Sequence, residues 1–192
     1  MTDEELKKLQ RYIGKRSQGQ TDEQVIEHIE KLNSKTPLKI EQWESLLYPT
    51  CANSDLVILI YILNKLVKID NIQEYMIHTV RSQEKRYEYI LKRIEVLKIL
   101  IPYIKENNKK SILSETLLTA SWYGELGIVK FLIDNGADIR YKDKENRDSF
   151  EYAKIYNQRF NDDILYNYLK YYYELGGKLD DIKVYYGVKK EK

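Results

Sequence analysis

The chain has 192 residues, 43% hydrophobic and 32% charged, which suits one domain with a buried core and a well-solvated surface. Lysine and arginine (32) nearly balance aspartate and glutamate (30), so the net charge of +2 excludes the strongly basic character of most duplex-reading proteins. The single cysteine, Cys51, excludes an intramolecular disulfide and fits a reducing compartment.

Two features of the sequence bear on its location. The first residues, Thr2 to Glu5, are acidic where the start of a secretory signal would be basic. The longest apolar run, Leu56 to Leu63, is far shorter than the roughly 20 residues that cross a bilayer. We therefore expect a soluble, cytoplasmic protein with no membrane partner, acting in its own cell or in a host. The 18 tyrosines, with abundant Lys, Asn and Ile, suggest an AT-rich genome.

The first 36 residues predict a pair of helices. Apolar residues recur at helical spacing within Asp3 to Ile13, and a flexible joint follows. Thr21 and Gln24 form a predicted capping box in front of a second apolar stripe. Pro37 ends that segment, because the residue before a proline disfavours the helical conformation. We expect residues 1–36 to be an N-terminal helical cap.

The next part of the chain contains apolar runs that alternate with charged joins. The run Leu56 to Leu63 is apolar on all sides, so periodicity alone allows a buried strand or a helix. We expect a helix, because Ile94 to Ile101 and Ile128 to Ile133 are bracketed in the same way. Glu74 to Val80 predicts a helix paired with Ile94 to Ile101, and the charged segment from Gln83 to Lys92 is interpreted as an extension between them.

The clearest pattern lies between Glu115 and Asp143. Gly124 ends a first predicted helix, Leu126 to Ile133 supply a second, and Gly136 fits a left-handed cap that only glycine adopts without steric cost. The segment Asp143 to Ala153 is predicted to form the next loop and first helix, and Asp148 in it corresponds to Glu115, 33 residues earlier. A final helix is expected at 164–175, followed by a tail.

This pattern resembles an ankyrin repeat. The segment 115–121, Glu-Thr-Leu-Leu-Thr-Ala-Ser, keeps part of the family's opening Thr-Pro-Leu-His-x-Ala-Ala, the segment 136–139 closes the unit, and 33 residues is the family's period. The resemblance implies an all-α fold, an ankyrin-like helical repeat solenoid of about four units. It would span residues 37–180, between the cap at 1–36 and a C-terminal tail at 181–192.

The resemblance also implies a concave face and loop tips that touch a partner protein. The first-helix positions expected on that face are Trp122, Tyr123, Ile155, Tyr156 and Arg81, and the loop-tip candidates are Tyr141, Lys144, Glu145 and Arg147. Tryptophan, tyrosine and arginine most often dominate interface energies. Packing of Trp122 against the next repeat, and a merely solvated turn at the tip, are equally open interpretations.

No catalytic constellation is visible. The chain has only His28 and His78, both interpreted as structural residues, and one cysteine, so we expect no catalytic residue, metal site or cofactor. We expect a non-catalytic protein-binding module that occupies a partner, of the kind that a phage, virus or microbe uses as an inhibitor or effector. The alternative is a nucleic-acid-binding protein that uses the basic and aromatic segment 81–92, with a second basic tip at 107–110.

Overall fold

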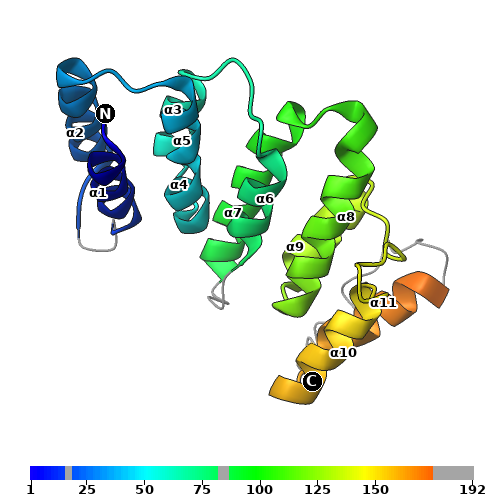
Figure 1. The fold of residues 1–192 in the computed structure, drawn as a ribbon. Helices are drawn as coiled ribbons and strands as arrows, with labels where there is room; N and C mark the ends of the chain where they lie inside the picture. The colour runs from blue at the N-terminus through cyan, green and yellow to red at the C-terminus, as the bar shows by residue number, and fades with distance from the viewer. Residues whose placement is uncertain (16–18, 82–86, 175–192) are drawn as a thin grey trace. The chain divides into compact units, whose positions relative to one another are not determined.

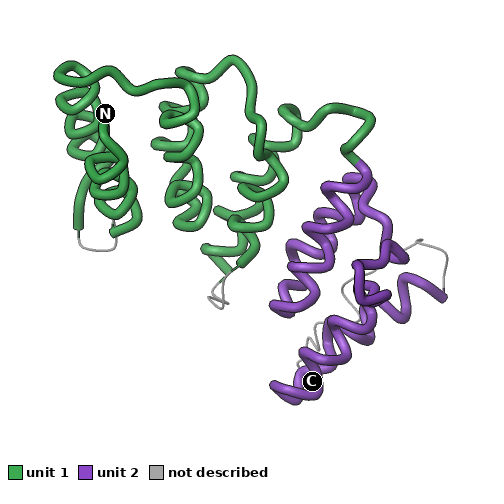
Figure 2. The backbone as a smooth tube through the Cα atoms, viewed as in Figure 1, with its two compact units in different colours: residues 1–109 green, residues 110–192 purple. Residues whose placement is uncertain are grey.

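The computed structural model describes residues 1–15, 19–81 and 87–174, and every regular element in these ranges is helical, which confirms the all-α prediction. The chain divides into two compact units, residues 1–109 and residues 110–192 (Figure 2). The boundary falls within the first turns of one helix, α8. The helices are α1 (Asp3–Gly14), α2 (Asp22–Lys35), α3 (Ile40–Ser45), α4 (Leu47–Asn53), α5 (Leu56–Leu63), α6 (Ile72–Val80), α7 (Tyr87–Leu100), η2 (Ile101–Tyr103), α8 (Glu106–Trp122), α9 (Leu126–Asp134), α10 (Ser149–Phe160) and α11 (Ile164–Glu174).

Unit 1 is a stack of helix pairs in two rows (Figure 1). The first helices of the pairs, α1, α4 and α6, pack side by side, and their partners α2, α5 and α7 pack side by side in the second row. Residues 1–36 therefore contribute a helix pair to the same two rows. Neighbouring pairs bury each other's apolar faces, as stacked helical repeats do.

Local sequence signals explain where several helices begin. The predicted capping box at α2 is present, since Thr21 Oγ1 accepts from the N–H of Gln24 (3.3 Å) and Gln24 Oε1 accepts from the N–H of Thr21 (3.0 Å). A second box caps α1 through Thr2 and Glu5. Asp148 caps α10 by accepting from two backbone N–H groups of its first turn. Each cap satisfies donors that a helix leaves unpaired.

The apolar run that periodicity left open is helix α5, as predicted. Ile58, Leu59, Ile62 and Leu63 are buried, whereas Val57 (47% exposed) and Ile60 (49% exposed) face outward. Buried positions that recur after one and four residues follow a helical period, not the alternation of a strand.

A proline splits the first helix of the second pair into α3 and α4. Pro49 has no N–H, and its ring would clash with the carbonyl of Ser45 in an unbroken helix. The Ser45 carbonyl instead accepts from Gln10 Nε2 of α1 (3.2 Å). The break thus frees an acceptor that ties α1 to its neighbour.

Left-handed residues make the tight turn between paired helices in both units. Gly124 has φ 68° after α8, and Ser54, which lies 70 residues earlier, has φ 55° after α4. The hydrogen bonds match: Ser54 N–H donates to Cys51 O and Asp55 N–H to Thr50 O, as Gly124 N–H does to Ser121 O and Glu125 N–H to Ala120 O. Gly136 adopts its predicted left-handed conformation, with φ 97°.

In one helix pair of each unit, a side-chain acceptor ties the first helix to the loop after its partner helix. In unit 1, Glu44 is 6% exposed, and its Oε1 accepts from the backbone N–H groups of Asp70 (2.9 Å) and Asn71 (2.8 Å). In unit 2, Ser114 lies 70 residues further on, and its Oγ accepts from the N–H of Asp138 (2.8 Å). In both units a side chain therefore accepts hydrogen bonds from backbone N–H groups of this loop, but the side chain differs between the units.

Two sequence predictions need correction or fall outside the described residues. Asn107 to Lys110, expected to form a loop tip, is helical because α8 begins at Glu106; this acidic residue suits a helix start, and no Gly or Pro interrupts the run into buried Ile112. The final helix α11 ends at Glu174, and Leu175 and the tail at 181–192 lie outside the described residues.

Gly124→Ala is expected to destabilise the protein more than Gly136→Ala. Both positions have positive φ, which costs a side chain about 1 kcal/mol. At Gly124 an added Cβ would also lie 2.4 Å from the Tyr156 ring, whereas nothing lies within 4 Å at Gly136. Urea unfolding followed by circular dichroism should show a loss of roughly 2–4 kcal/mol at Gly124. Equal losses for the two variants would contradict the packing of Tyr156 on Gly124.

Glu44→Ala is expected to weaken unit 1 by about 1–3 kcal/mol, because two backbone donors of the following loop lose their acceptor. The matched control is Glu41→Ala, an exposed position on the same helix α3, where a change within about 0.5 kcal/mol is expected. The same urea measurement compares them. A loss at Glu44 no larger than that at Glu41 would show that the loop does not depend on this carboxylate.

Candidate partner-binding surface

The loop between α9 and α10 is organised by one carboxylate, that of Asp143. Its Oδ1 accepts from the N–H groups of Glu145 (3.0 Å) and Arg147 (2.8 Å), while its own N–H donates to the Arg147 carbonyl (3.0 Å). Asn146 takes the left-handed conformation inside this turn, with φ 61°. The predicted loop tip is therefore a closed turn with a fixed backbone.

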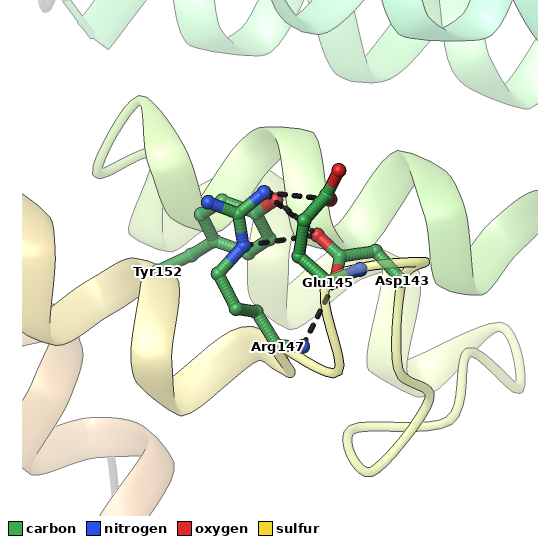
Figure 3. Close-up of polar contacts among 4 residues, drawn as sticks. All are labelled: Asp143, Glu145, Arg147 and Tyr152. Carbon is green, nitrogen blue, oxygen red and sulfur yellow. Dashed lines mark hydrogen bonds and ion pairs between the residues drawn. The ribbon is translucent and has the colours of Figure 1, made fainter.

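The second oxygen of Asp143 fixes side chains above the turn. Asp143 Oδ2 accepts from Arg147 Nε (3.2 Å) and from the hydroxyl of Tyr152, and a terminal nitrogen of Arg147 donates to Glu145 Oε2 (2.8 Å) (Figure 3). The Arg147 guanidinium also lies over the Tyr152 ring, 4.9 Å from its centroid. Arg147 is thus held by two carboxylates on one side and an aromatic ring on the other.

The contacts continue from Tyr152 to the end of α8. The rings of Tyr152 and Trp122 meet edge to face, with centroids 5.6 Å apart and an interplanar angle of 83°. The Arg159 guanidinium lies 5.0 Å from the centroid of the Trp122 ring. Tyr152 and Arg159 are seven residues apart on α10, which places them on one helical face. We call the set Arg147, Tyr152, Trp122 and Arg159 the arginine–aromatic ladder.

The contacts shift the pKa values of the Asp143–Tyr152 pair in opposite directions. Partial burial acts to raise the pKa of Asp143, but hydrogen bonds from Tyr152 and Arg147 outweigh it and lower the pKa to about 2. Burial, together with the Asp143 hydrogen bond and charge, raises the pKa of Tyr152 to about 12. At neutral pH Asp143 is an acceptor and Tyr152 a donor, so the bond between them is fixed.

The structure brings together some of the predicted partner-binding residues. Trp122, Glu145 and Arg147 meet in or beside the ladder. Tyr123 and Ile155 are half-buried, and Lys144 is exposed at the loop tip. Tyr152 and Arg159 were not among the predicted residues, because their positions opposite Trp122 depend on how α10 packs against α8.

Other predicted residues have different surroundings. Tyr156 is 8% exposed and packs over Gly124 and against Phe160, so its side chain offers little surface to a partner. The Tyr141 hydroxyl donates to Glu115 Oε1 (2.9 Å), which ties the loop to α8. Arg81 is exposed at the end of α6 and belongs to unit 1.

Part of the basic and aromatic segment 81–92 can also be described. Residues 82–86 lie outside the described residues, and α7 begins at Tyr87, which is 72% exposed. Lys92 Nζ lies 5.7 Å from the centroid of the Tyr89 ring, and Glu88 is exposed between the two tyrosines. The carboxylate of Glu88 interrupts what would otherwise be a basic and aromatic strip.

Histidine and cysteine are few in this chain, which has His28, His78 and Cys51. Within 1–15, 19–81 and 87–174, no group of three or more His, Cys, Asp or Glu side chains could hold a metal ion. No helix in the same ranges has the length and apolar character needed to cross a membrane. Burial raises the pKa of Cys51 to about 12, so its thiol stays protonated and inert at neutral pH. The rings of His28 and His78 lie tilted against those of Tyr12 and Tyr48, with centroids 4.2 Å and 4.1 Å apart, respectively.

The stabilisation that Asp143 supplies should be lost in acid. Its pKa is lower in the folded protein than the ordinary value near 4, so its contribution is complete above about pH 5 and disappears as pH falls towards 2. The difference in unfolding free energy between the unmodified protein and Asp143→Asn should therefore be constant from pH 7 to 5 and shrink below pH 4. Urea unfolding at each pH measures it.

Tyr152→Phe provides the internal check on this prediction. Removing the hydroxyl takes away one of the hydrogen bonds that lower the Asp143 pKa in the folded protein, so in this variant the total acid loss should be smaller and should be complete at a higher pH. The pH at which the loss begins is set by the unfolded-state pKa and should not change. A difference between unmodified protein and Asp143→Asn that is the same at pH 5 and pH 2.5 would contradict the assigned role of Asp143.

Comparison with known proteins gives no family assignment. No protein-family model, no curated protein and no solved structure matches this chain.

Proposed function

We propose that this chain is a non-catalytic protein-binding module with an ankyrin-like repeat architecture. Two observations support the architecture. The helix pairs of unit 1 form two rows. The turns at Ser54 and Gly124, 70 residues apart, have the same left-handed backbone and the same hydrogen bonds. A spacing near twice 33 residues is what an array with a short insertion produces.

The observation that carries the binding proposal is the arginine–aromatic ladder. Tryptophan, tyrosine and arginine are the side chains that most often carry interface energy, because each buries a large area and keeps a polar contact. Here they touch one another, and Asp143 fixes one end of the set. Side chains held in place before binding lose less conformational entropy when a partner arrives.

The proposed mechanism is steric. The ladder and the adjoining loop tip occupy a surface of another protein and thereby block or recruit it. This mechanism needs no proton transfer, cofactor or metal, and it suits the inhibitor or effector role expected from the sequence. Exposed Lys144 and Glu145 beside the ladder carry opposite charges, which suits partner selection more than raw affinity.

Trp122→Ala and Tyr123→Ala are expected to abolish partner capture from cell extract. Hot-spot truncations cost about 2 kcal/mol or more, so recovery of a specific partner should fall more than tenfold. The matched control is Tyr103→Ala, which removes a partly exposed aromatic side chain from unit 1. Circular dichroism of each variant establishes that it is folded.

Retention of every captured partner by both variants would overturn the proposed surface. The nucleic-acid alternative predicts a different result: binding of a labelled single-stranded oligonucleotide that weakens steeply with salt and persists in the Trp122 variant. A partner that Trp122→Ala releases and Tyr103→Ala keeps would support the protein-binding module.

A further inference from the structure

The two arginines of the ladder differ in how their charge is used. The Arg147 guanidinium is already paired with Asp143 and Glu145. The Arg159 guanidinium lies over Trp122, its side chain is exposed, and the structure records no carboxylate for it among the described residues. The charge of Arg147, at one end of the ladder, is neutralised by these carboxylates. Arg159, at the other end, presents its positive charge to solvent.

Stacking on tryptophan prepares Arg159 to bind an anion. Contact with the ring face orients the planar guanidinium without neutralising it, and leaves its N–H edge available. That edge matches the two oxygens of a carboxylate, and such charge-assisted, bidentate pairs are stronger than ordinary hydrogen bonds. The rotamer of Arg159 is constrained before the partner arrives, which lowers the entropic cost of forming the pair.

We propose that the partner segment bound by the ladder is an acidic peptide segment, with a carboxylate on Arg159 and an adjacent apolar or aromatic side chain against Trp122. This inference rests on the proposed protein-binding function and names the chemistry of its partner. It makes Arg159 the residue that selects the partner's charge.

Neighbouring charges favour a peptide over a nucleic acid. The loop and the first turn of α10 carry both signs of charge: Asp143, Glu145, Asp148 and Glu151 lie among Lys142, Lys144 and Arg147. Asp143 and Glu145 are already paired with Arg147. A phosphate backbone carries a negative charge at every nucleotide and would meet the remaining carboxylates. A peptide can place a single carboxylate at Arg159 and present residues of either sign to this mixed-charge loop.

Because the partner is unidentified, the experiment uses a random 12-residue displayed peptide library selected on the immobilised full chain. The expected result is enrichment of peptides in which Asp or Glu lies close to an aromatic or large apolar residue. A synthetic, fluorescein-labelled copy of the most enriched peptide then serves as the probe for anisotropy titrations at fixed salt.

The variants compare charge, shape and position. Arg159→Gln removes the charge and should weaken binding of the enriched peptide about tenfold, the effect of losing a hydrogen-bonded charge pair. Arg159→Lys keeps the charge without the planar fork and should be intermediate. Lys154→Gln removes an exposed charge elsewhere on α10 and should stay within about twofold.

The outcomes separate this inference from the proposed function. Enriched peptides that lack acids, or acidic peptides that bind Arg159→Gln and the unmodified chain equally, would overturn the role of Arg159; dependence on Trp122 would then still support the binding surface. Failure to enrich any peptide would count against both. Tighter, Arg159-dependent binding of a labelled oligothymidylate would overturn the acidic-peptide assignment in favour of a nucleic acid.

Discussion

Asp143 uses both of its carboxylate oxygens to connect the backbone of a loop to side chains on its surface. One oxygen closes the turn by accepting two N–H groups, and the other orients Arg147 and Tyr152. Because Tyr152 in turn contacts Trp122, the single side chain of Asp143 links the loop to the aromatic residues on α10 and α8. Without that carboxylate the turn would lose two of its hydrogen bonds, and the guanidinium would be held only by Glu145 and the Tyr152 ring. A surface of large side chains would remain, but its members would not be held in one arrangement.

The two units contain turns of similar backbone geometry that are formed by different residues. A left-handed residue ends the first helix at Ser54 and at Gly124, and a buried acceptor holds the following loop through Glu44 and through Ser114. Serine in the left-handed region costs more than glycine, and this cost is tolerated where the surrounding hydrogen bonds require the conformation. Backbone hydrogen bonding is the constraint that repeats here; the side chain that meets it varies between the units.

Features that depend on neighbouring residues were predicted from the sequence more readily than features that depend on how the helices pack. The capping box at Thr21 and the left-handed Gly136 follow from local rules, since each depends only on residues close in the chain. Helix α5 did not follow from its local pattern, and the similar bracketing of two later apolar runs decided that prediction. The start of α8 was missed because Asn107 to Lys110 has the composition of a turn yet leads directly into a buried helical run. Within the site, Trp122 and Arg147 were found by residue type. Arg159 was missed, because only the packing of α10 against α8 places it over Trp122.

The electrostatics of the ladder fix the protonation states of Asp143 and Tyr152 near neutral pH. A general acid or base works best with a pKa near the operating pH, whereas Asp143 is held near 2 and Tyr152 near 12. At neutral pH Asp143 is therefore ionised and Tyr152 is protonated, so the hydrogen bond between them always runs from the hydroxyl to the carboxylate. That bond helps to hold Arg147 and Tyr152 in one arrangement beside Trp122, and the proposed binding role depends on this arrangement.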